Sequence, residues 1–336
     1  MAFLLQQTLI YAIPLMFVAL AGIFAERSGI INLALVGIMI MGAFVGVLVV
    51  YSFQKAGLFT KDMGQLLMLT ALLISAAAGA AFSLLLAFAA INLKADQTIG
   101  GTALNLMAPA VVLFLINIII SQNTLGMYTG DAASWFMVKK TDLGFSKTDN
   151  IGLLGEVFLN KFYLTNYIGI VLYVVLSVVL YKTRFGLRLR ACGENPQAAD
   201  SLGINVYKMR YAGVAISGAL AGTGGFIYAL TTANCASTGD VAGFGFLALA
   251  VMIFGNWKPL NTALAALLFG LCKCIAAAYS TIDINGDGVY MLKELGISPY
   301  IYRMLPFVIT LVGLPFTAGK SRAPKAEGIP YDKGSR

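Results

Sequence analysis

Apolar residues form long runs along most of this chain. Nine runs stand out, at residues 4–24, 30–51, 64–92, 99–121, 165–182, 211–232, 243–254, 259–280 and 303–317. A helix needs about 20 mostly apolar residues to cross the hydrocarbon core of a bilayer. The run at 243–254 is too short to cross alone, which favours a half-helix or one arm of a re-entrant hairpin. The pattern predicts an all-α, polytopic membrane bundle of about eight to ten transmembrane helices.

A short internal sequence similarity, which we name the internal echo, bears on how the bundle is built. Residues 33–39 resemble residues 247–252, both in apolar runs. Transporter folds often consist of two related halves and contain discontinuous helices. The echo is consistent with two such halves, although six or seven apolar residues can also match by chance.

The amino-acid composition also indicates a protein that is surrounded mainly by lipid. The chain is 59% hydrophobic and 11% charged, whereas soluble domains carry about 25% charged residues. No basic segment precedes the first run, which favours an uncleaved helix with its N-terminus outside. Nine crossings then place the transmembrane domain at 1–318 and a basic cytoplasmic tail at 319–336, with external loops at 122–164 and 281–302 and a cytoplasmic loop at 183–210.

The net charge of +8 is explained by this orientation. Lysine and arginine are more frequent in the segments assigned to the cytoplasm, as the positive-inside rule requires. Because the cations lie between membrane spans, orientation explains them better than binding to nucleic acid does.

The chain lacks the side chains that several classes of activity require. The chain has no histidine, and no apolar run contains an aspartate or glutamate in its interior. This argues against histidine-based catalysis and proton relays, and against a carrier driven by protons. Residues 313–321 resemble a phosphate-binding loop, but the glycine spacing is one residue too long and no strand precedes it. We therefore expect no enzyme activity in this chain, and any ATP and magnesium to be bound by a partner.

The predicted cytoplasmic loop contains a short capped helix. Asn195 is a favourable N-cap, Pro196 fits the first helical position, and Gly203 can end the helix in a left-handed conformation. One interpretation is a turn that orders the loop. The other is a coupling helix that docks into a groove on an ATPase, formed by Glu194, Asn195, Pro196, Ala198, Ala199, Ser201, Leu202 and Gly203. In the second case both alanines would allow close approach to the partner.

Four motifs in order give the chain a resemblance to a known family. They are E-R-S-G-I-I-N at 26–32, the segment 96–106, G-E-N-P with the following residues at 193–204, and F-G-F-L-A-L-A at 244–250. Together they resemble the branched-chain amino acid and simple-sugar permease family of ABC importers, and most closely its nucleoside branch. One departure is Val36, where the family usually has glutamate.

The resemblance implies a bacterial plasma-membrane importer. Two permease chains would pair, ATPase domains would bind on the cytoplasmic side, and an extracellular lipoprotein would deliver a nucleoside. Transport of a simple sugar or a branched-chain amino acid is the alternative within the family. A stand-alone sodium-coupled carrier is the alternative outside it.

Polar residues on or beside the apolar runs are candidates for the substrate path. Thr98, Thr102 and Asn105 lie at helical spacing on one face, next to Gly100 and Gly101. Lys273 lies deep in its run, where an ammonium needs a wet path, a partner or an interface unless it extends to the membrane surface. The candidates are Asn32, Thr98, Thr102, Asn105 and Lys273. The alternative is that the threonines and asparagines bond between packed helices.

The predicted external loop at 281–302 contains a calcium-type pattern. Residues 283–294 match the twelve-residue EF-hand loop, with ligands expected at Asp283, Asn285, Asp287, Val289 and Glu294. A polar turn that joins two spans is the alternative. Apart from calcium, no cofactor is expected in this chain.

Overall fold

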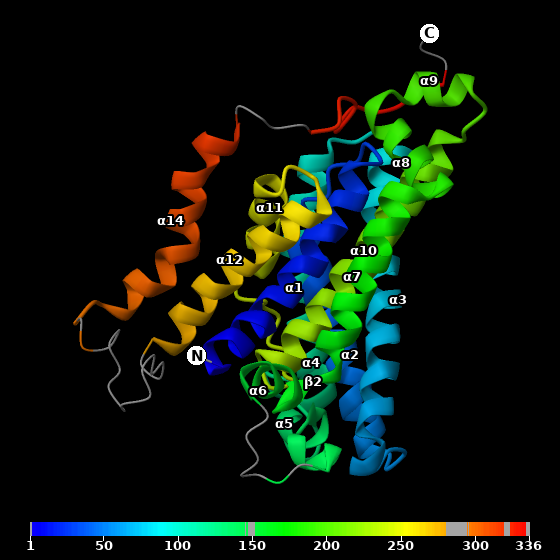
Figure 1. Cartoon of the computed structure of the whole chain (residues 1–336). Helices are drawn as coiled ribbons and strands as arrows, with labels where there is room; N and C mark the ends of the chain where they lie inside the picture. Colours follow the sequence, from blue (N-terminus) through cyan, green and yellow to red (C-terminus); the bar gives the residue numbers. More distant parts are fainter. Residues whose placement is uncertain are drawn as a thin grey trace.

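The computed structural model describes residues 2–144, 146, 152–279, 294, 296–318 and 323–333. Within these residues, seven helices are long and apolar enough to span a membrane (Figure 1): α1 (Ala2–Glu26), α2 (Leu35–Lys55), α3 (Gly64–Ile91), α4 (Gln97–Ile120), α7 (Leu164–Lys182), α10 (Val206–Thr231) and α12 (Pro259–Ala278). Two further apolar helices are α11 (Phe244–Phe254) and α14 (Pro299–Ala318). The predicted all-α membrane bundle is confirmed. The short run near 243–254 is indeed the half-length helix α11, with 11 residues.

Helices α1 and α10 form the centre of the bundle. Most of their residues are buried, whereas α4 and α7 expose much of their surface. Helix α1 packs against α10, α11 and α12, and α10 packs against α2 and α3. Figure 1 shows α12 and α14 on one side of this centre and α3 on the other. The exposed faces of α4 and α7 carry large apolar residues, which suits contact with lipid.

Glycines let α2, α3 and α10 approach at backbone distance. A Cβ atom on Gly222 of α10 would lie 2.9 Å from the Gly79 Cα atom of α3 and 2.5 Å from the Ser75 carbonyl oxygen. A Cβ atom on Gly42 of α2 would in turn overlap the backbone of Gly222. Small residues are what membrane helices use for such close crossings. This contact fixes the distance between the three helices.

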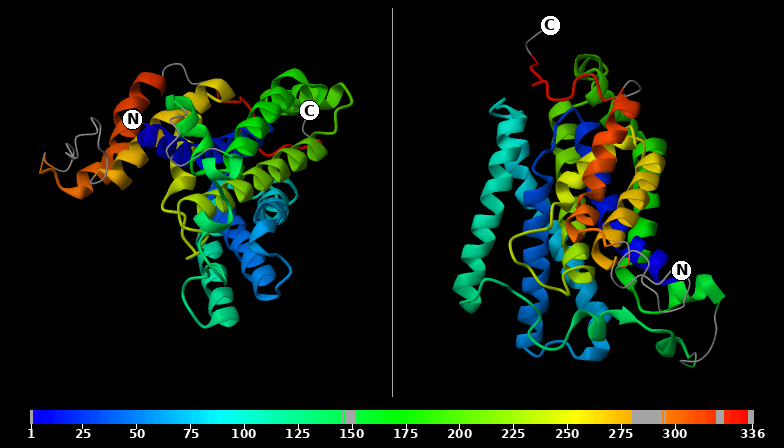
Figure 2. Two further views of the ribbon diagram at one scale, coloured as in Figure 1. Left: turned by 60° about the horizontal axis from the view of Figure 1, so that its bottom comes forward. Right: turned by 90° about the vertical axis from the view of Figure 1, so that its left-hand side faces the viewer.

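Two groups of short elements cap the ends of the bundle. At the end that we name the α9 end lie α8 (Arg184–Glu194), α9 (Pro196–Ser201) and residues 323–333, which we name the tail (Figure 1). At the opposite end, named the α5 end, lie the connection from α4 to α7 and the start of α1 (Figure 2). That connection contains α5 (Ala132–Trp135), β1 (Met137–Val138), η2 (Lys140–Leu143), α6 (Gly152–Leu159) and β2 (Phe162–Tyr163), while η1 (Lys61–Met63) precedes α3.

The α5 end is held together by two small β contacts. Strands β1 and β2 pair antiparallel, with Met137 opposite Tyr163. Leu125 forms an isolated bridge with Ser237, which lies in the connection from α10 to α11. Helix α10 therefore crosses the bundle to the α5 end, and the chain then turns back into the half-length helix α11.

Candidate functional site

The link between α1 and α2, residues 27–34, is irregular and largely buried. Asn32 is fully buried, and its amide donates a hydrogen bond to the Ser217 Oγ atom of α10 at 2.9 Å. The Asn32 Oδ1 atom accepts the Ala34 backbone N–H at 3.1 Å, just before α2 begins. The Ile31 N–H donates to the Gln97 side chain of α4 at 2.7 Å. Side chains from neighbouring helices thus satisfy backbone groups that a continuous helix would have paired.

Asn105 of α4 completes this arrangement. Its Nδ2 atom donates to the Leu33 carbonyl oxygen at 2.7 Å, and its Oδ1 atom accepts the Gly37 N–H at 2.8 Å. Asn32 and Asn105, both predicted for the substrate path, are therefore brought together around one irregular segment. In the described conformation their hydrogen bonds hold this segment in place, as the alternative interpretation expects.

The two predicted threonines lie elsewhere. Thr98 and Thr102 are exposed on the outer face of α4. The Thr102 hydroxyl donates to the Thr98 carbonyl oxygen of its own helix at 2.9 Å. The structure does not join these threonines to Asn32, and their place in a substrate path stays a prediction.

The predicted caps of α9 are present. The Asn195 side chain accepts the Ala198 N–H at 3.0 Å, Pro196 is the first helical residue, and Gly203 has a φ of +79°. Ala198 and Leu202 are exposed, and Leu202 is 81% accessible at an end of the bundle where the neighbouring side chains are mostly polar. This exposed face of α9 is available to a partner.

The position of Ala199 differs from the expectation, because we expected both Ala198 and Ala199 to approach a partner closely. Ala199 is only 2% exposed and lies in a small apolar cluster with Cys192, Val206 and Tyr331. Tyr331 belongs to the tail, so the tail covers the inner side of α9. Burial also raises the pKa of the Cys192 thiol to about 11, which keeps it protonated.

The tail is docked on the α9 end. The Ala326 N–H donates to the Gly193 carbonyl oxygen at 2.9 Å, and the Gly328 N–H donates to that of Gly29 at 3.2 Å. The Ile329 carbonyl oxygen accepts a hydrogen bond at 3.0 Å from Arg210, a fully buried residue near the start of α10. The tail therefore joins the α1–α2 link, the end of α8 and the start of α10.

Charged residues from the end of α1, from α8 and from the tail lie close together. Glu26 is buried at the end of α1 and accepts a hydrogen bond from the indole N–H of Trp257. The neighbouring Arg27 forms an ion pair with Glu194 of α8 at 3.3 Å. Burial raises the pKa of Glu327 in the tail, while its hydrogen bond with Glu26 and the charge of Arg27 oppose this shift. Glu26, Arg27 and Glu194 lie in the sequence motifs, but those motifs do not indicate that Trp257 and the tail contact them.

Comparison with known proteins identifies the family. A model of the branched-chain amino acid transport system permease component matches residues 4–314. The chain belongs to this permease family. It is 41% identical over 325 residues to a nucleoside ABC transporter permease protein, NupC, of Lactococcus lactis, covering 97% of this chain and 95% of the relative. It is 39% identical over 338 residues to a guanosine ABC transporter permease protein, NupQ, of Bacillus subtilis, covering 100% and 98%. No solved structure matches the chain.

A more distant relative widens the range of named substrates within the family. A putative glucose ABC transporter permease protein, TsgC13, of Haloferax volcanii is 27% identical over 322 residues, covering 93% of this chain and 91% of the relative. Relatives that are named for different substrates are therefore similar to this chain over most of its length.

Val36, where the resemblance leads us to expect a glutamate, lies at a contact between two helices. Val36 is the second residue of α2, and a Cβ atom on Gly245 of α11 would lie 2.6 Å from the Val36 Cγ2 atom. Residues 33–39 and 247–252, the two segments of the internal echo, thus belong to helices that pack together. Their derivation from related halves stays a prediction.

Lys273 of the permease contacts the turn that leads into α11. Its Nζ atom donates to the Ala242 carbonyl oxygen at 3.2 Å and lies 5.0 Å from the Phe244 ring centre and 5.9 Å from that of Phe307. A cation over aromatic rings is stabilised electrostatically. Lys273 therefore ties α12 to α11 and α14, and the structure places it at an interface between elements. Its role in the substrate path stays a prediction.

The predicted calcium ligands Asp283, Asn285, Asp287 and Val289 lie outside the described residues. Glu294 is described and exposed. Calcium binding at this loop stays a prediction.

Asn105 provides a test of the α1–α2 link. Asn105→Ala removes two hydrogen bonds and leaves the Leu33 carbonyl and the Gly37 N–H without partners. We expect the free energy of unfolding in detergent to fall by about 1–3 kcal/mol. Thr102→Ala is the matched control on the same helix, where loss of an exposed hydroxyl should change it by less than about 0.5 kcal/mol. Equal effects of the two changes would contradict the role given to Asn105.

Proposed function

We propose that this chain is the permease subunit of an ATP-driven ABC importer and forms the membrane path for a nucleoside. The observation that carries the proposal is similarity over nearly the full length to two permeases that are named for nucleosides and guanosine. ATP hydrolysis, with magnesium, is expected in a separate cytoplasmic subunit. A second permease chain and an extracellular binding lipoprotein are the other expected partners.

The proposed orientation places the α9 end in the cytoplasm and the start of α1 outside. Its support is the distribution of cations: the α9 end carries Lys94, Lys182, Arg184, Arg188, Arg190, Lys208, Lys258 and Lys325. Positive charge is retained on the cytoplasmic side of membrane proteins. The N-terminus and the tail lie at opposite ends of the bundle, in agreement with this orientation (Figure 1).

In this orientation α9 is the proposed coupling helix, and a short chain of contacts leads from it into the membrane. Helix α8 ends where α9 begins, and a Cβ atom on Gly193 would overlap the Arg27 carbonyl oxygen. The ion pair between Arg27 and Glu194 reinforces this contact. A displacement of α9 by an ATPase would therefore act directly on residues 27–34, which Asn32 bonds to α10.

Uptake by cells tests the substrate class. In a strain without redundant carriers, deletion of this chain is expected to lower uptake of labelled guanosine at least about tenfold. Complementation should restore it, and uptake of glucose and leucine should be unaffected. Glucose uptake is measured because one relative is named for glucose. Loss of glucose uptake with intact guanosine uptake would contradict the nucleoside proposal and indicate a sugar permease.

A further inference from the structure

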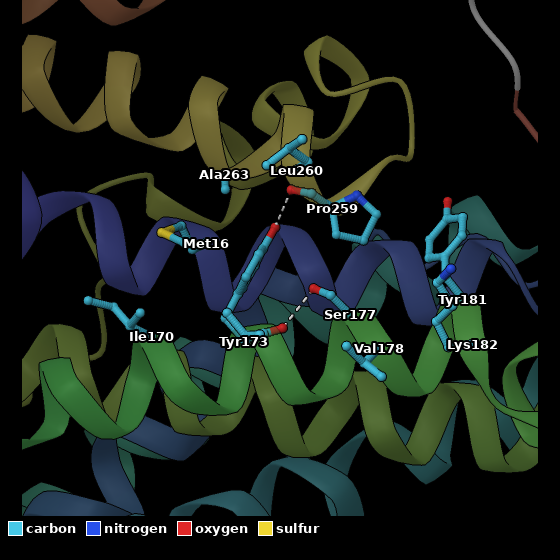
Figure 3. Close-up of a pocket in the computed structure, with 11 residues that line it drawn as sticks. Met16, Ile170, Tyr173, Ser177, Val178, Tyr181, Lys182, Pro259, Leu260 and Ala263 are labelled. Atoms are coloured by element: carbon cyan, nitrogen blue, oxygen red, sulfur yellow. Dashed lines mark hydrogen bonds between the residues drawn. The ribbon is translucent and has the colours of Figure 1, made fainter.

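An apolar groove runs along the outside of the bundle between α7 and α12 (Figure 3). Its volume is about 410 Å³. Helix α7 contributes Ile170, Val174 and Val178, helix α12 contributes Leu260 and Ala263, and Met16 of α1 lies between them. The groove thus has walls from two membrane helices and a floor from a third.

The polar groups in the groove are already satisfied. The Tyr173 hydroxyl donates to the Pro259 carbonyl oxygen at 2.8 Å, and the Ser177 hydroxyl donates to that of Tyr173 at 2.7 Å (Figure 3). The Tyr181 hydroxyl donates to the Trp257 carbonyl oxygen at 2.9 Å. An occupant therefore needs no hydrogen-bonding groups here, and a hydrocarbon chain fits these walls without leaving a buried polar group unpaired.

The α9 end of the groove opens next to a basic hollow. Tyr181 lines the groove and also a neighbouring hollow of about 490 Å³, together with Arg27, Glu194, Lys258 and Lys325. Lys182 lies at this end of the groove. Arg27 pairs with Glu194, whereas none of the three lysines takes part in the ion pairs that the described residues form. The hollow therefore has an excess of positive charge.

The dimensions match one lipid chain. From Lys182 to Ile170 the groove follows α7 over 12 residue-to-residue steps, or about 18 Å at 1.5 Å per residue. One leaflet of the hydrocarbon core is about 15 Å deep. A chain that begins at the basic hollow would thus end near the middle of the bilayer.

We propose that the groove and the hollow together bind one anionic phospholipid. An acyl chain lies in the groove, and the phosphate of the headgroup lies in the hollow, within reach of Lys182, Lys258 and Lys325. Lysines at the membrane surface attract anionic lipids, by about fivefold in affinity for each residue. The bound chain would pack against Tyr173 and Tyr181, which brace α7 against residues 257–259.

Binding of phosphatidylglycerol and phosphatidylcholine to the purified, delipidated permease, measured by native mass spectrometry, tests the proposal. The parent is expected to retain phosphatidylglycerol in preference to phosphatidylcholine. Lys182→Gln with Lys258→Gln should weaken phosphatidylglycerol binding by about 25-fold, from about fivefold for each lysine. The matched control is Arg188→Gln with Lys208→Gln, which removes two exposed cations at the same end outside the groove and should change binding less than twofold.

A second variant separates the chain site from the charge. Ala263→Phe fills the groove without altering any charge and is expected to weaken binding of both lipids. Equal affinity for the two lipids in the parent, or equal losses in the lysine variant and its control, would overturn the proposal. So would efficient disulfide cross-linking of Val178→Cys between two permease chains, since a second protein chain would then cover the groove.

Discussion

Replacement of Gly222 by leucine is expected to prevent accumulation of folded permease. The position has no room for a side chain, because a Cβ atom already meets the Ser75 carbonyl oxygen at 2.5 Å and Gly79 of α3 at 2.9 Å. Both obstacles are backbone atoms, which cannot rotate away as a flexible side chain can. Leucine would therefore separate α10 from α3, and with them the helix α2 that packs on Gly222 through Gly42.

A graded series makes this prediction measurable. Gly222→Ala adds one methyl group and is expected to lower the free energy of unfolding by about 1–3 kcal/mol through overpacking. Gly100→Ala is the matched control, because its Cβ atom would meet only the Leu86 side chain, at 3.4 Å. Unfolding in detergent, followed by fluorescence, compares the three variants with the parent. A fully folded Gly222→Leu protein with parental stability would contradict the backbone contact described here.

Ala198→Arg is expected to lower ATPase binding and nucleoside transport at least about tenfold while the permease remains folded. Ala198 lies on the exposed face of α9, next to the capping Asn195, so the new side chain adds bulk and charge without disturbing the bundle. The short helix docks only if its surface fits a groove on the partner. Pull-down of the ATPase and transport in vesicles measure the two effects.

Two comparison variants separate docking from folding. Ala95→Arg introduces the same side chain at an exposed position outside α9, in the connection between α3 and α4, and should retain ATPase binding. Ala199→Arg should instead lower stability, because Ala199 is 2% exposed beneath Tyr331. Normal ATPase recovery with Ala198→Arg would place the docking surface elsewhere on the α9 end.

The sequence predicted the features that depend on local pattern. Apolar runs marked the membrane helices, and the short run at 243–254 marked the half-length helix α11. The caps of α9 followed from Asn195, Pro196 and Gly203, because capping depends on neighbouring backbone groups. These predictions needed no knowledge of tertiary contacts.

The direction in which a residue faces was harder to predict. Helical spacing put Thr98, Thr102 and Asn105 on one face of α4, but it did not say which part of that face meets the bundle. The buried stripe of α4 runs through Gly101, Leu104 and Ala108, with Asn105 at its edge and the threonines beyond it. In a membrane both sides of this boundary are apolar, so hydrophobicity alone does not separate lipid from protein.

The docking of the tail was missed for a related reason. Residues 323–333 have no periodic pattern, and the hydrogen bonds that hold them to Gly193, Gly29 and Arg210 use backbone groups of Ala326, Gly328 and Ile329. Almost any sequence can supply such groups, so they leave no motif. The inward position of Ala199 was missed as a result, because it depends on Tyr331 of the tail.

Import by the reconstituted complex tests the central proposal most directly. Vesicles would contain this permease and its candidate partners, with the binding protein and labelled guanosine on the side of the α1 start and ATP with magnesium on the side of α9. We predict accumulation of guanosine that requires ATP hydrolysis and is lost with Ala198→Arg. Accumulation driven by a sodium gradient, by this chain alone and without ATP, would contradict an ABC importer.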